Sequence, residues 1–438
     1  MRLQHRPPSL PEETIRKAVR LVDEETGVIK ILFEAPIASG APKIFGCGCL
    51  RGDYDRLGFP SDNRISGSTS LVRDQAIAAA IGEAIERYSA AFVPYDEITV
   101  LSYETLSMRA VAPQSLTLYD ADQYCRPGFG YKSVGCDEPI GWVNGYSLTR
   151  REWILVPAFA VYQPYQSVVD EAPVIQQITT GLACGNTLEE AILSAICEIV
   201  ERDAAMLMWL QMRRPPKVNL DGLAEGLVSD ACSRFGDLRR HITVLDVTTD
   251  LGIPAYVSVW DGPIDKERGA IFTSSANLVP GRAVVGALTE LAQSLMWAAG
   301  LIDGGTHVPD PRTEKFSRIE EHVLWPLRPS ARPAFEFALS SDKLVDLDNH
   351  ACAGPNDVLT AIQTCVDRLS AQGHEVIVVD VTSPDIRECG FHVVRAIVPG
   401  CQPLFFGTGM HRLSVRAKCN PYPDRAADSL NLHPHPFP

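Results

Sequence analysis

The sequence predicts a mixed α/β fold with antiparallel hairpins, built from two repeated halves of helix and sheet. A helical segment occurs twice, as DQAIAAAIGEAIER at 74–87 and as EEAILSAICEIVER at 189–202, with seven identities over fourteen positions and no gap. Apolar runs of strand length occur in pairs between helical segments, which favours hairpins over a doubly wound parallel sheet. The length of 438 residues also favours two or three lobes over one minimal core.

The elements follow from apolar periodicity and from the turn residues between the runs. In the first part of the chain we expect helices at 12–25 and 72–92 and strands at 28–34, 44–50 and 153–162. The second copy of the repeat lies in a predicted helix at 187–212. That helix ends before Pro215 and Pro216, because proline cannot donate the helical hydrogen bond.

The second part alternates strand pairs with helices. We expect helices at 282–299 and 357–371 and strands at 242–247, 255–260, 270–274, 375–381 and 391–398. Residues 304–341 are rich in proline and charge, and we expect them to form an excursion on the surface.

By domain, the sequence divides into three parts. We expect an N-terminal helix and strands at 1–60, a main domain at 61–415 with the internal repeats 66–92 and 179–212, and a proline-rich tail at 416–438.

Composition excludes several classes of protein. A formal charge of −14 disfavours a nucleic-acid partner and a polybasic membrane anchor. The N-terminus has no apolar signal segment, and no uninterrupted apolar run reaches about 18 residues, so we expect a cytoplasmic protein without a membrane span. The twelve cysteines are scattered and form no C-x-x-C, which favours reduced, mostly buried thiols.

Familiar catalytic motifs are absent. The chain has no G-x-x-x-x-G-K-[ST] phosphate loop, no G-x-G-x-x-G after a strand, no H-E-x-x-H helix and no G-x-S-x-G turn. A nucleotide, if bound, must be bound by other means.

The repeated helices carry the most informative chemistry. Both copies end in E-x-x-E-R, at 83–87 and 198–202, and each places these charges on the face opposite its apolar stripe. Carboxylates at i and i+3 can share a hard cation, and the adjacent arginine can hold a phosphate oxygen. The plainer interpretation is an amphipathic helix with a solvated acidic face. The small residues around the carboxylates, and the glycine-containing polar segments before both helices, favour an anion site instead.

Two further features extend this hypothesis. The helix at 282–299 places Glu290 and Gln293 on one face, although a surface pair is the plainer interpretation unless this helix meets the other two. The tail alternates Pro434, Pro436 and Pro438, so it is stiff and extended and could deliver its α-carboxylate to a fixed place. A frayed terminus is the alternative. The histidines of the tail, at 433 and 435, could bind metal but lie more often in solvent.

Several segments together resemble the YcaO family. Residues 66–89, 179–203 and 287–294 resemble its three signatures in the family's order, and 380–404 together with the P-x-P-x-P ending resembles its azoline-forming cyclodehydratase branch. The resemblance implies a YcaO-type α/β fold with the two halves around an ATP site. It also implies ATP-dependent conversion of Cys, or Ser/Thr, in a ribosomally made precursor peptide to thiazoline or oxazoline. Thiazole- and oxazole-modified peptides of the bacteriocin kind are the expected products.

The resemblance also implies the roles of individual residues, with ATP and Mg²⁺ as cofactors. The Mg²⁺ ligands would be Glu83, Glu86, Glu198 and Glu201. The ATP-binding residues would be Arg87, Asn186, Ser194, Arg202, Glu290 and Gln293. The catalytic group would be the α-carboxylate of Pro438, as a proton acceptor or organiser near the peptide.

The expected partners follow from the same resemblance. Besides the precursor peptide, we expect a separate protein resembling ubiquitin-activating enzymes that presents the leader, and a homodimer. Oxidation to the aromatic azole would need a separate flavin-dependent dehydrogenase.

This sequence departs from the family pattern at three places. It has Ser68-Thr69-Ser70 where many relatives have Gly-Lys-Gly, Ala79 where a serine is frequent, and Leu295 where an arginine is frequent. Two alternatives stay open: a YcaO enzyme that forms thioamides or amidines, and a non-catalytic ATP-binding scaffold subunit of a peptide-modifying complex.

Overall fold

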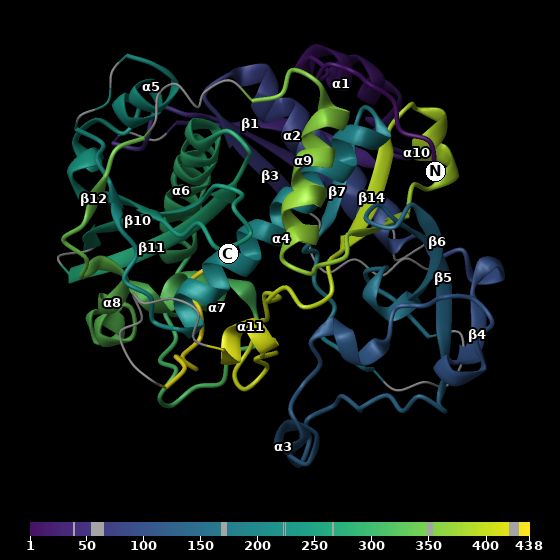
Figure 1. The fold of residues 1–438 in the computed structure, drawn as a ribbon. Helices are drawn as coiled ribbons and strands as arrows, with labels where there is room; N and C mark the ends of the chain where they lie inside the picture. Colours follow the sequence, from purple (N-terminus) through teal and green to yellow (C-terminus); the bar gives the residue numbers. More distant parts are fainter. Residues whose placement is uncertain are drawn as a thin grey trace.

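The computed structural model describes residues 1–37, 40–53, 65–167, 173–221, 223, 225–264, 267–347, 354–419 and 429–438. Within them the strands form three sheets, almost entirely antiparallel (Figure 1). The mixed α/β class with hairpins is therefore confirmed. One parallel pair occurs, between two short strands at a sheet edge.

The largest sheet has six strands in the order β4-β5-β13-β14-β7, with β6 paired to β5. Its strands are β4 (Thr99–Ser102), β5 (Pro139–Ser147), β6 (Glu152–Pro157), β7 (Leu182–Gly185), β13 (Ile377–Asp380) and β14 (His392–Ile397). The pairing of β14 with β7 connects the C-terminal strands to the segment that leads into the second repeated helix. Strand β5 and the short β7 were not expected from the sequence.

The second sheet has five strands in the order β11-β10-β9-β8-β12. These are β8 (Lys217–Val218), β9 (Ile242–Asp246), β10 (Ala255–Ile264), β11 (Glu267–Ala276) and β12 (Leu344–Val345). The third sheet is β1-β2-β3, from β1 (Ile29–Ala35), β2 (Phe45–Arg51) and β3 (Ile65–Ser70). Strand β3 leads directly into the first repeated helix, as β7 leads into the second.

Three long helices hold the sheets together. They are α2 (Arg73–Ala91), α4 (Leu188–Leu210) and α6 (Pro280–Asp303). Helix α4 packs against β14 and β7 on one side and β10 and β11 on the other, so it is buried along most of its length. Helix α2 contacts β3 and β7, and α6 contacts β10, β11 and β3. The three helices thus converge where the sheets approach one another.

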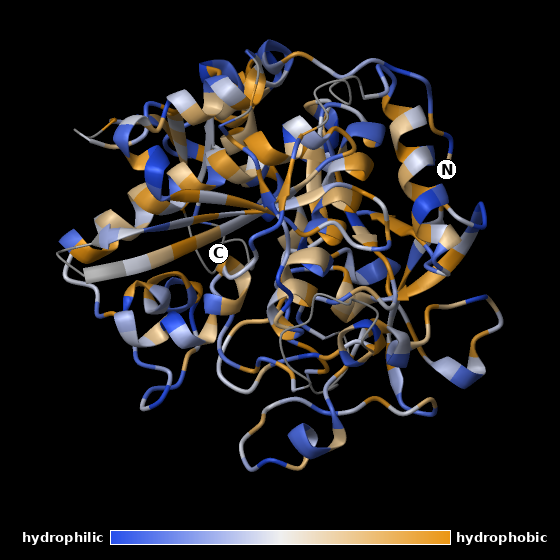
Figure 2. Ribbon diagram, turned by 60° about the vertical axis from the view of Figure 1, so that its left-hand side comes forward, coloured by the Kyte–Doolittle hydropathy of each residue, from blue (hydrophilic) through white to orange (hydrophobic). Residues whose placement is uncertain are grey.

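Shorter helices complete the fold. They are α1 (Pro11–Ala18), α3 (Ala121–Tyr124), α5 (Leu227–Ser233), α7 (Ile319–Leu324), α8 (Glu336–Leu339), α9 (Val358–Ala371), α10 (Pro384–Glu388) and α11 (Val415–Lys418). The first is shorter than predicted, because the chain continues as a tighter turn at Val19–Leu21 and then pairs Val22 with Ile29. Figure 2 shows bands of hydrophobic and hydrophilic residues along the helices, as amphipathic packing requires.

The prediction of a surface excursion at 304–341 was wrong. Proline does break this segment into short helices, but several large side chains of the segment lie in the core. Phe316, His322, Trp325 and Phe335 are all buried there. Apolar residues spaced irregularly between prolines have no helical or strand period, so the sequence pattern did not reveal their burial.

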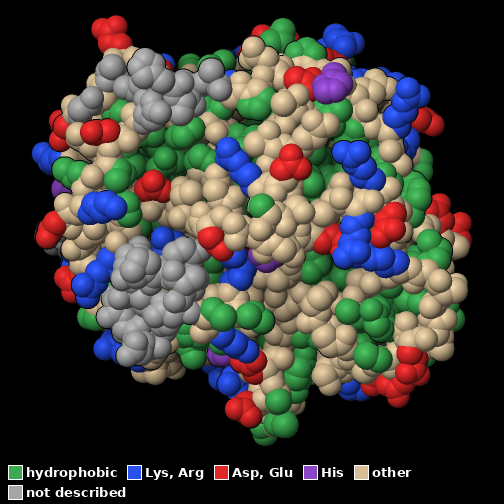
Figure 3. Space-filling model, in the orientation of Figure 1, with side chains coloured by type: hydrophobic (Ala, Val, Ile, Leu, Met, Phe, Trp, Pro, Cys, Tyr) green, Lys and Arg blue, Asp and Glu red, His purple; other side chains and the backbone are tan. Residues whose placement is uncertain are grey.

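Helix α6 is long and apolar enough, by length and composition, to cross a membrane. In this fold it covers β10 and β11, and that packing accounts for its apolar face. The eleven cysteines among the described residues are free thiols, as expected. On the face shown in Figure 3, acidic and basic side chains are interspersed rather than gathered into a patch of one sign.

Candidate functional site

The two copies of the repeat also make equivalent hydrogen bonds. The backbone N–H of Gly67, in β3, donates to the Oε2 atom of Glu83 at 3.0 Å. The backbone N–H of Gly181, just before β7, donates to the Oε2 atom of Glu198 at 3.0 Å. In both halves, therefore, the segment that precedes a helix anchors the first carboxylate of the E-x-x-E-R sequence on that same helix.

Each arginine of the repeat lies between its two carboxylates. Arg87 approaches Glu83 at 3.6 Å and Glu86 at 3.8 Å. Arg202 approaches Glu198 at 3.9 Å and Glu201 at 3.6 Å. These separations give charge attraction with little hydrogen bonding. The Nε atom of Arg202 is buried and has no hydrogen-bond partner, so this guanidinium retains donor capacity for another group.

Helix α6 meets the other two helices. The side-chain amide of Gln293 donates to the backbone carbonyl of Gly67 at 3.1 Å, and the Thr69 hydroxyl donates to the carbonyl of Thr289 at 2.7 Å. Burial, together with the charge of Glu201, raises the pKa of Glu290 to about 8. The interpretation of Glu290 and Gln293 as an ordinary surface pair is therefore excluded.

The carboxylates crowd one another. Burial raises the pKa of Glu86 to about 8 although Arg87 opposes the shift, and the charges of Glu198 and Glu83 raise it further. Burial also raises the pKa of Glu201 to about 7, against the effect of Arg202, and raises that of Glu198. Five carboxylates therefore share the two arginines of the repeat, and added positive charge would stabilise their ionised forms. We call this group the charged cluster: Glu83, Glu86, Arg87, Glu198, Glu201, Arg202 and Glu290.

The cluster fits a metal bound together with phosphates. Among the described residues, no three His, Cys, Asp or Glu side chains converge closely enough to hold a metal ion by themselves. Magnesium is ordinarily held by one or two carboxylates plus phosphate oxygens and water. The carboxylates supply ligands of that kind, and the Nε–H of Arg202, which has no hydrogen-bond partner, can donate to a phosphate oxygen.

Two predicted residues, Asn186 and Ser194, form no hydrogen bond with the carboxylates or arginines of the repeat in the described part of the chain. Asn186, before α4, donates from its side-chain amide to the Thr14 hydroxyl at 2.6 Å, and its Oδ1 atom is buried without a partner. Its backbone N–H donates to Glu190 at 3.0 Å, and Lys17 of α1 donates to its carbonyl at 3.3 Å. Ser194 is exposed on α4, one turn before Glu198.

The prediction missed the residues of α1 around Asn186, and it missed Arg395. Glu190 had only a helix-capping signal, T-x-x-E, which the structure confirms as a capping box.

Arg395, on β14, interacts electrostatically with Glu198 and Glu86, while burial lowers its pKa to about 10. No sequence pattern links this strand to the repeated helices, because the pairing of β14 with β7 and the packing of β14 on α4 join residues far apart in the chain.

The C-terminal tail runs into the centre of the molecule, close to α4 (Figure 1). The Nη1 atom of Arg202 donates to a carbonyl oxygen of Pro438 at 3.1 Å. Phe437 is wholly buried, and the indole of Trp209 donates to the carbonyl of His433 at 3.1 Å. The tail is therefore an ordered part of the core, and the frayed terminus is excluded.

The expectation that both tail histidines lie in solvent was half wrong. His433 is exposed, but His435 is wholly buried beside His322, with ring centroids 4.4 Å apart. The Nε2 atom of His435 and the carbonyl of Phe405 are hydrogen-bonded. His322 accepts from the backbone N–H of Gly407 at 3.0 Å, so its Nδ1–H donates to the carbonyl of His435 at 2.8 Å. Both rings are thus fully used by backbone groups.

Sequence comparisons place the chain among known proteins. Residues 69–402 match the model of the YcaO cyclodehydratase family, which is ATP- and Mg²⁺-binding. An uncharacterized protein of Methanothermobacter thermautotrophicus is 31% identical over 363 residues, covering 80% of this chain and 87% of its own. An uncharacterized protein from the tfuA 3′ region of Rhizobium leguminosarum bv. trifolii is 28% identical over 341 residues, covering 75% of this chain and 74% of its own.

Solved structures share the fold. A heterocyclase in complex with substrate and cofactor matches with a TM-score of 0.81 and 24% identity, over 100% of this chain and 59% of its own. The heterocyclase TruD matches with 0.71 and 25% identity, over 100% and 55%. YcaO from Methanopyrus kandleri, bound with AMPPCP and Mg²⁺, matches with 0.65 and 20% identity, over 90% and 92%. This chain thus spans somewhat more than half the length of the two heterocyclases.

The family match covers most of the chain, and it includes both E-x-x-E-R helices, α6 and the strands that bring them together. The chain belongs to the YcaO family.

Proposed function

We propose that this protein is an ATP-dependent cyclodehydratase that forms thiazolines or oxazolines in a precursor peptide. One observation carries the proposal: α2, α4 and α6 bring the carboxylates and arginines of the repeat together with Glu290, and the tail delivers Pro438 to Arg202. A site with charged groups but no nucleophile–base pair of its own suits a reaction in which the peptide supplies the nucleophile.

The residues divide between metal and nucleotide. Glu83, Glu86, Glu198 and Glu201 would hold Mg²⁺, where the cation would offset the burial that raises the pKa of three of them. The nucleotide would be bound by Arg87, Asn186, Ser194, Arg202, Glu290 and Gln293. Bound ATP–Mg²⁺ supplies the phosphoryl group that converts a backbone amide oxygen into a leaving group.

Pro438 would act on protons. Its terminal carboxylate is held by Arg202, whose other contacts are the repeat carboxylates, so the carboxylate sits at the edge of the charged cluster. There it would accept the proton of the attacking Cys thiol or Ser/Thr hydroxyl. Next to the departure at 68–70, Gly67 donates to Glu83 and Thr69 donates to the carbonyl of Thr289 on α6.

The decisive experiment combines product mass with phosphate release. The wild-type chain, supplied with precursor and partner protein, should release phosphate and remove one water per modified residue. Glu201→Ala and Glu83→Ala should abolish both. The matched control is Glu189→Gln: Glu189 is also buried on α4, but it accepts a hydrogen bond from the backbone N–H of Gln4 at 2.6 Å, at the far end of the helix.

Each other outcome has a defined meaning. Exchange of oxygen for sulfur would refute azoline formation in favour of a thioamide enzyme, and incorporation of an amine would favour an amidine. ATP binding without peptide-dependent phosphate release would identify a scaffold subunit.

Partners belong to the same proposal. A separate protein resembling ubiquitin-activating enzymes would present the leader peptide. A homodimer and a separate flavin-dependent dehydrogenase complete the proposed assembly.

A further inference from the structure

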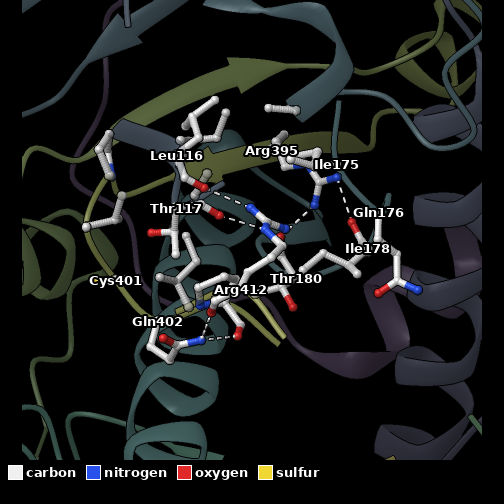
Figure 4. Close-up of a pocket in the computed structure, with 18 of the residues that line it drawn as sticks. Leu116, Thr117, Ile175, Gln176, Ile178, Thr180, Arg395, Cys401, Gln402 and Arg412 are labelled. Carbon is white, nitrogen blue, oxygen red and sulfur yellow. Dashed lines mark hydrogen bonds between the residues drawn. The ribbon is translucent and has the colours of Figure 1, made fainter. Parts of the chain in front are cut away.

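A cavity of about 100 Å³ lies beside the charged cluster, and the proposed function does not use it. Its walls come from Ile199 on α4, the segments 116–117, 159–160 and 175–180, the end of β14 with the loop 399–403, and Arg412. Figure 4 shows two guanidiniums in this wall, those of Arg395 and Arg412. The remaining lining is mostly aliphatic and aromatic.

Both arginines are buried without a carboxylate partner. Each is 4% exposed. Arg395 donates to the backbone carbonyls of Val161, Ile178 and Thr180, at 3.0, 2.8 and 2.6 Å. Arg412 donates to those of Leu116 and Thr117, both at 2.8 Å. Neither forms an ion pair with any Asp or Glu in the part of the chain that the structure describes.

The donors are not exhausted by these bonds. A guanidinium carries N–H groups on all three nitrogens, and each terminal nitrogen carries two. Arg412 uses only Nε and Nη2, so its Nη1 has no acceptor among the described residues. Buried charge is costly unless it is paired, and backbone carbonyls supply only partial negative charge.

The electrostatics agree with this geometry. Burial lowers the pKa of both arginines to about 10, and the charge of Arg412 acts further on Arg395 in the same direction. Glu198 and Glu86 oppose the shift at Arg395 from the side of the charged cluster, and tyrosines at 119, 124 and 131 oppose it at Arg412. The cavity therefore holds two buried guanidiniums in a mostly apolar lining.

We propose that this cavity binds a small oxyanion, held by the guanidiniums of Arg395 and Arg412, neither of which forms an ion pair with a carboxylate of the described residues. Two sources share this chemistry: a carboxylate of the peptide substrate, and free inorganic phosphate. The aliphatic walls formed by Leu116, Ile175 and Ile199 favour a carboxylate with an apolar body.

The site is connected to the proposed reaction centre. Arg395 holds the carbonyl of Thr180, and the next residue, Gly181, donates the hydrogen bond that anchors Glu198. An anion bound to Arg395 would therefore contact a side chain whose acceptor residue, Thr180, directly precedes the anchoring Gly181. The proposal stands on the cavity itself and does not require the cyclodehydratase activity.

The test is ligand-dependent thermal unfolding of the full chain at constant ionic strength. Phosphate, acetate and isovalerate are each titrated, with chloride as the reference. A bound oxyanion should give a saturable rise in Tm beyond that in chloride. A stronger effect of isovalerate than of acetate identifies a carboxylate with an apolar body, and a stronger effect of phosphate identifies the inorganic ion.

The variants make the test specific. Arg412→Gln should weaken oxyanion affinity at least tenfold. Arg213→Gln is the matched control, because Arg213 is 5% exposed and donates to the backbone carbonyl of Val247 but lies outside the cavity. Unchanged affinity in Arg412→Gln, or a wild-type response equal to that in chloride, overturns the proposal.

A second set of measurements covers the case in which Arg412→Gln does not fold. Arg412→Lys keeps the charge but loses the planar fork of donors, so it should fold and bind the oxyanion more weakly. In the wild type, the oxyanion should protect Arg395 and Arg412 from phenylglyoxal, mapped by mass spectrometry, and leave Arg213 unprotected. Equal modification with and without the anion contradicts the site. None of these readouts depends on turnover, so failure here is distinct from failure of the proposed function.

Discussion

Two glycines show how individual residues set the site. Gly67 and Gly181 make the same hydrogen bond to their respective glutamates, but their backbones differ. Gly181 has a φ of +84°, and an added Cβ would lie 2.5 Å from the carbonyl oxygen of Ala396. At Gly67 the nearest atom to an added Cβ is the carbonyl oxygen of Cys47, at 3.3 Å. Only the second copy thus requires glycine for its backbone conformation.

This difference gives the first prediction. Gly181→Ala should lower the free energy of unfolding by roughly 1–3 kcal/mol through backbone strain, and it should weaken nucleotide binding because the anchor of Glu198 moves. Gly67→Ala should cost less in both. Denaturant unfolding and nucleotide titration on the two variants measure the contrast. Equal losses would contradict the asymmetry between the two halves.

At the scale of elements, the short helix α7 positions the tail. Its residue His322 contacts both the Gly407 loop and the carbonyl of His435, three residues before the terminus at Pro438. We predict that His322→Ala loosens the tail and lowers peptide turnover while nucleotide affinity stays near the wild-type value.

A double-mutant comparison separates positioning from general damage. In a chain extended by one glycine after Pro438, the terminal carboxylate is already displaced from Arg202. His322→Ala should then cause little further loss of turnover in that background. A loss as large as in the unextended chain would show that His322 acts on overall stability and not through the terminus.

The buried histidine also predicts a pH dependence of stability. Burial lowers the pKa of His322 to about 4, against 6.5 for the ordinary side chain. The unfolded chain therefore binds more protons between these values, so stability is lost as pH falls from about 6.5 toward 4. Glu86 and Glu290, whose pKa values are raised to about 8, act in the opposite direction. Their contribution to the stability of the protein is lost as pH rises toward 8.

Thermal unfolding between pH 4 and 7 isolates the histidine contribution. The glutamate contribution is common to wild type and His322→Gln, so it cancels in their difference. We expect a shallower decline at acidic pH in His322→Gln. Parallel curves would show that the ring keeps an ordinary pKa in the folded state.

For the whole molecule, the sequence predicted the individual helices well, but it did not predict how they pack together. The period of α2, α4 and α6 identified the faces that carry Glu83, Glu198 and Glu290, because amphipathic spacing is a local property. Their convergence depends on the pairing of β14 with β7 and on the contact of β3 with α6, which join residues far apart in the chain. Arg395 stayed hidden for the same reason.

Other failures have equally physical causes. The segment 304–341 looked polar because its prolines break every period, although its aromatic residues fill the core. His435 was expected in solvent because a single histidine in a tail carries no burial signal, whereas its neighbours Phe405 and His322 come from distant parts of the chain.

The size of the molecule gives a further prediction. This chain spans 59% of the length of one heterocyclase of the same fold, and the proposed function gives recognition of the leader peptide to a separate partner protein. Adding that partner should raise kcat/KM for a precursor that carries its leader and leave the rate on a leaderless core peptide unchanged. An equal stimulation of both peptides would show that the partner activates the enzyme without recognising the leader.

The doubled glycine–glutamate anchor has a consequence for how such a site changes over generations. In a pair of identical subunits, every substitution would alter both halves of the site together. Here the two halves lie in one polypeptide, so each half can drift alone. Ala79 now stands in one helix where Ser194 stands in the other, and only one of the two anchoring glycines is strained. A substitution in one half therefore leaves the residues of the other half unchanged.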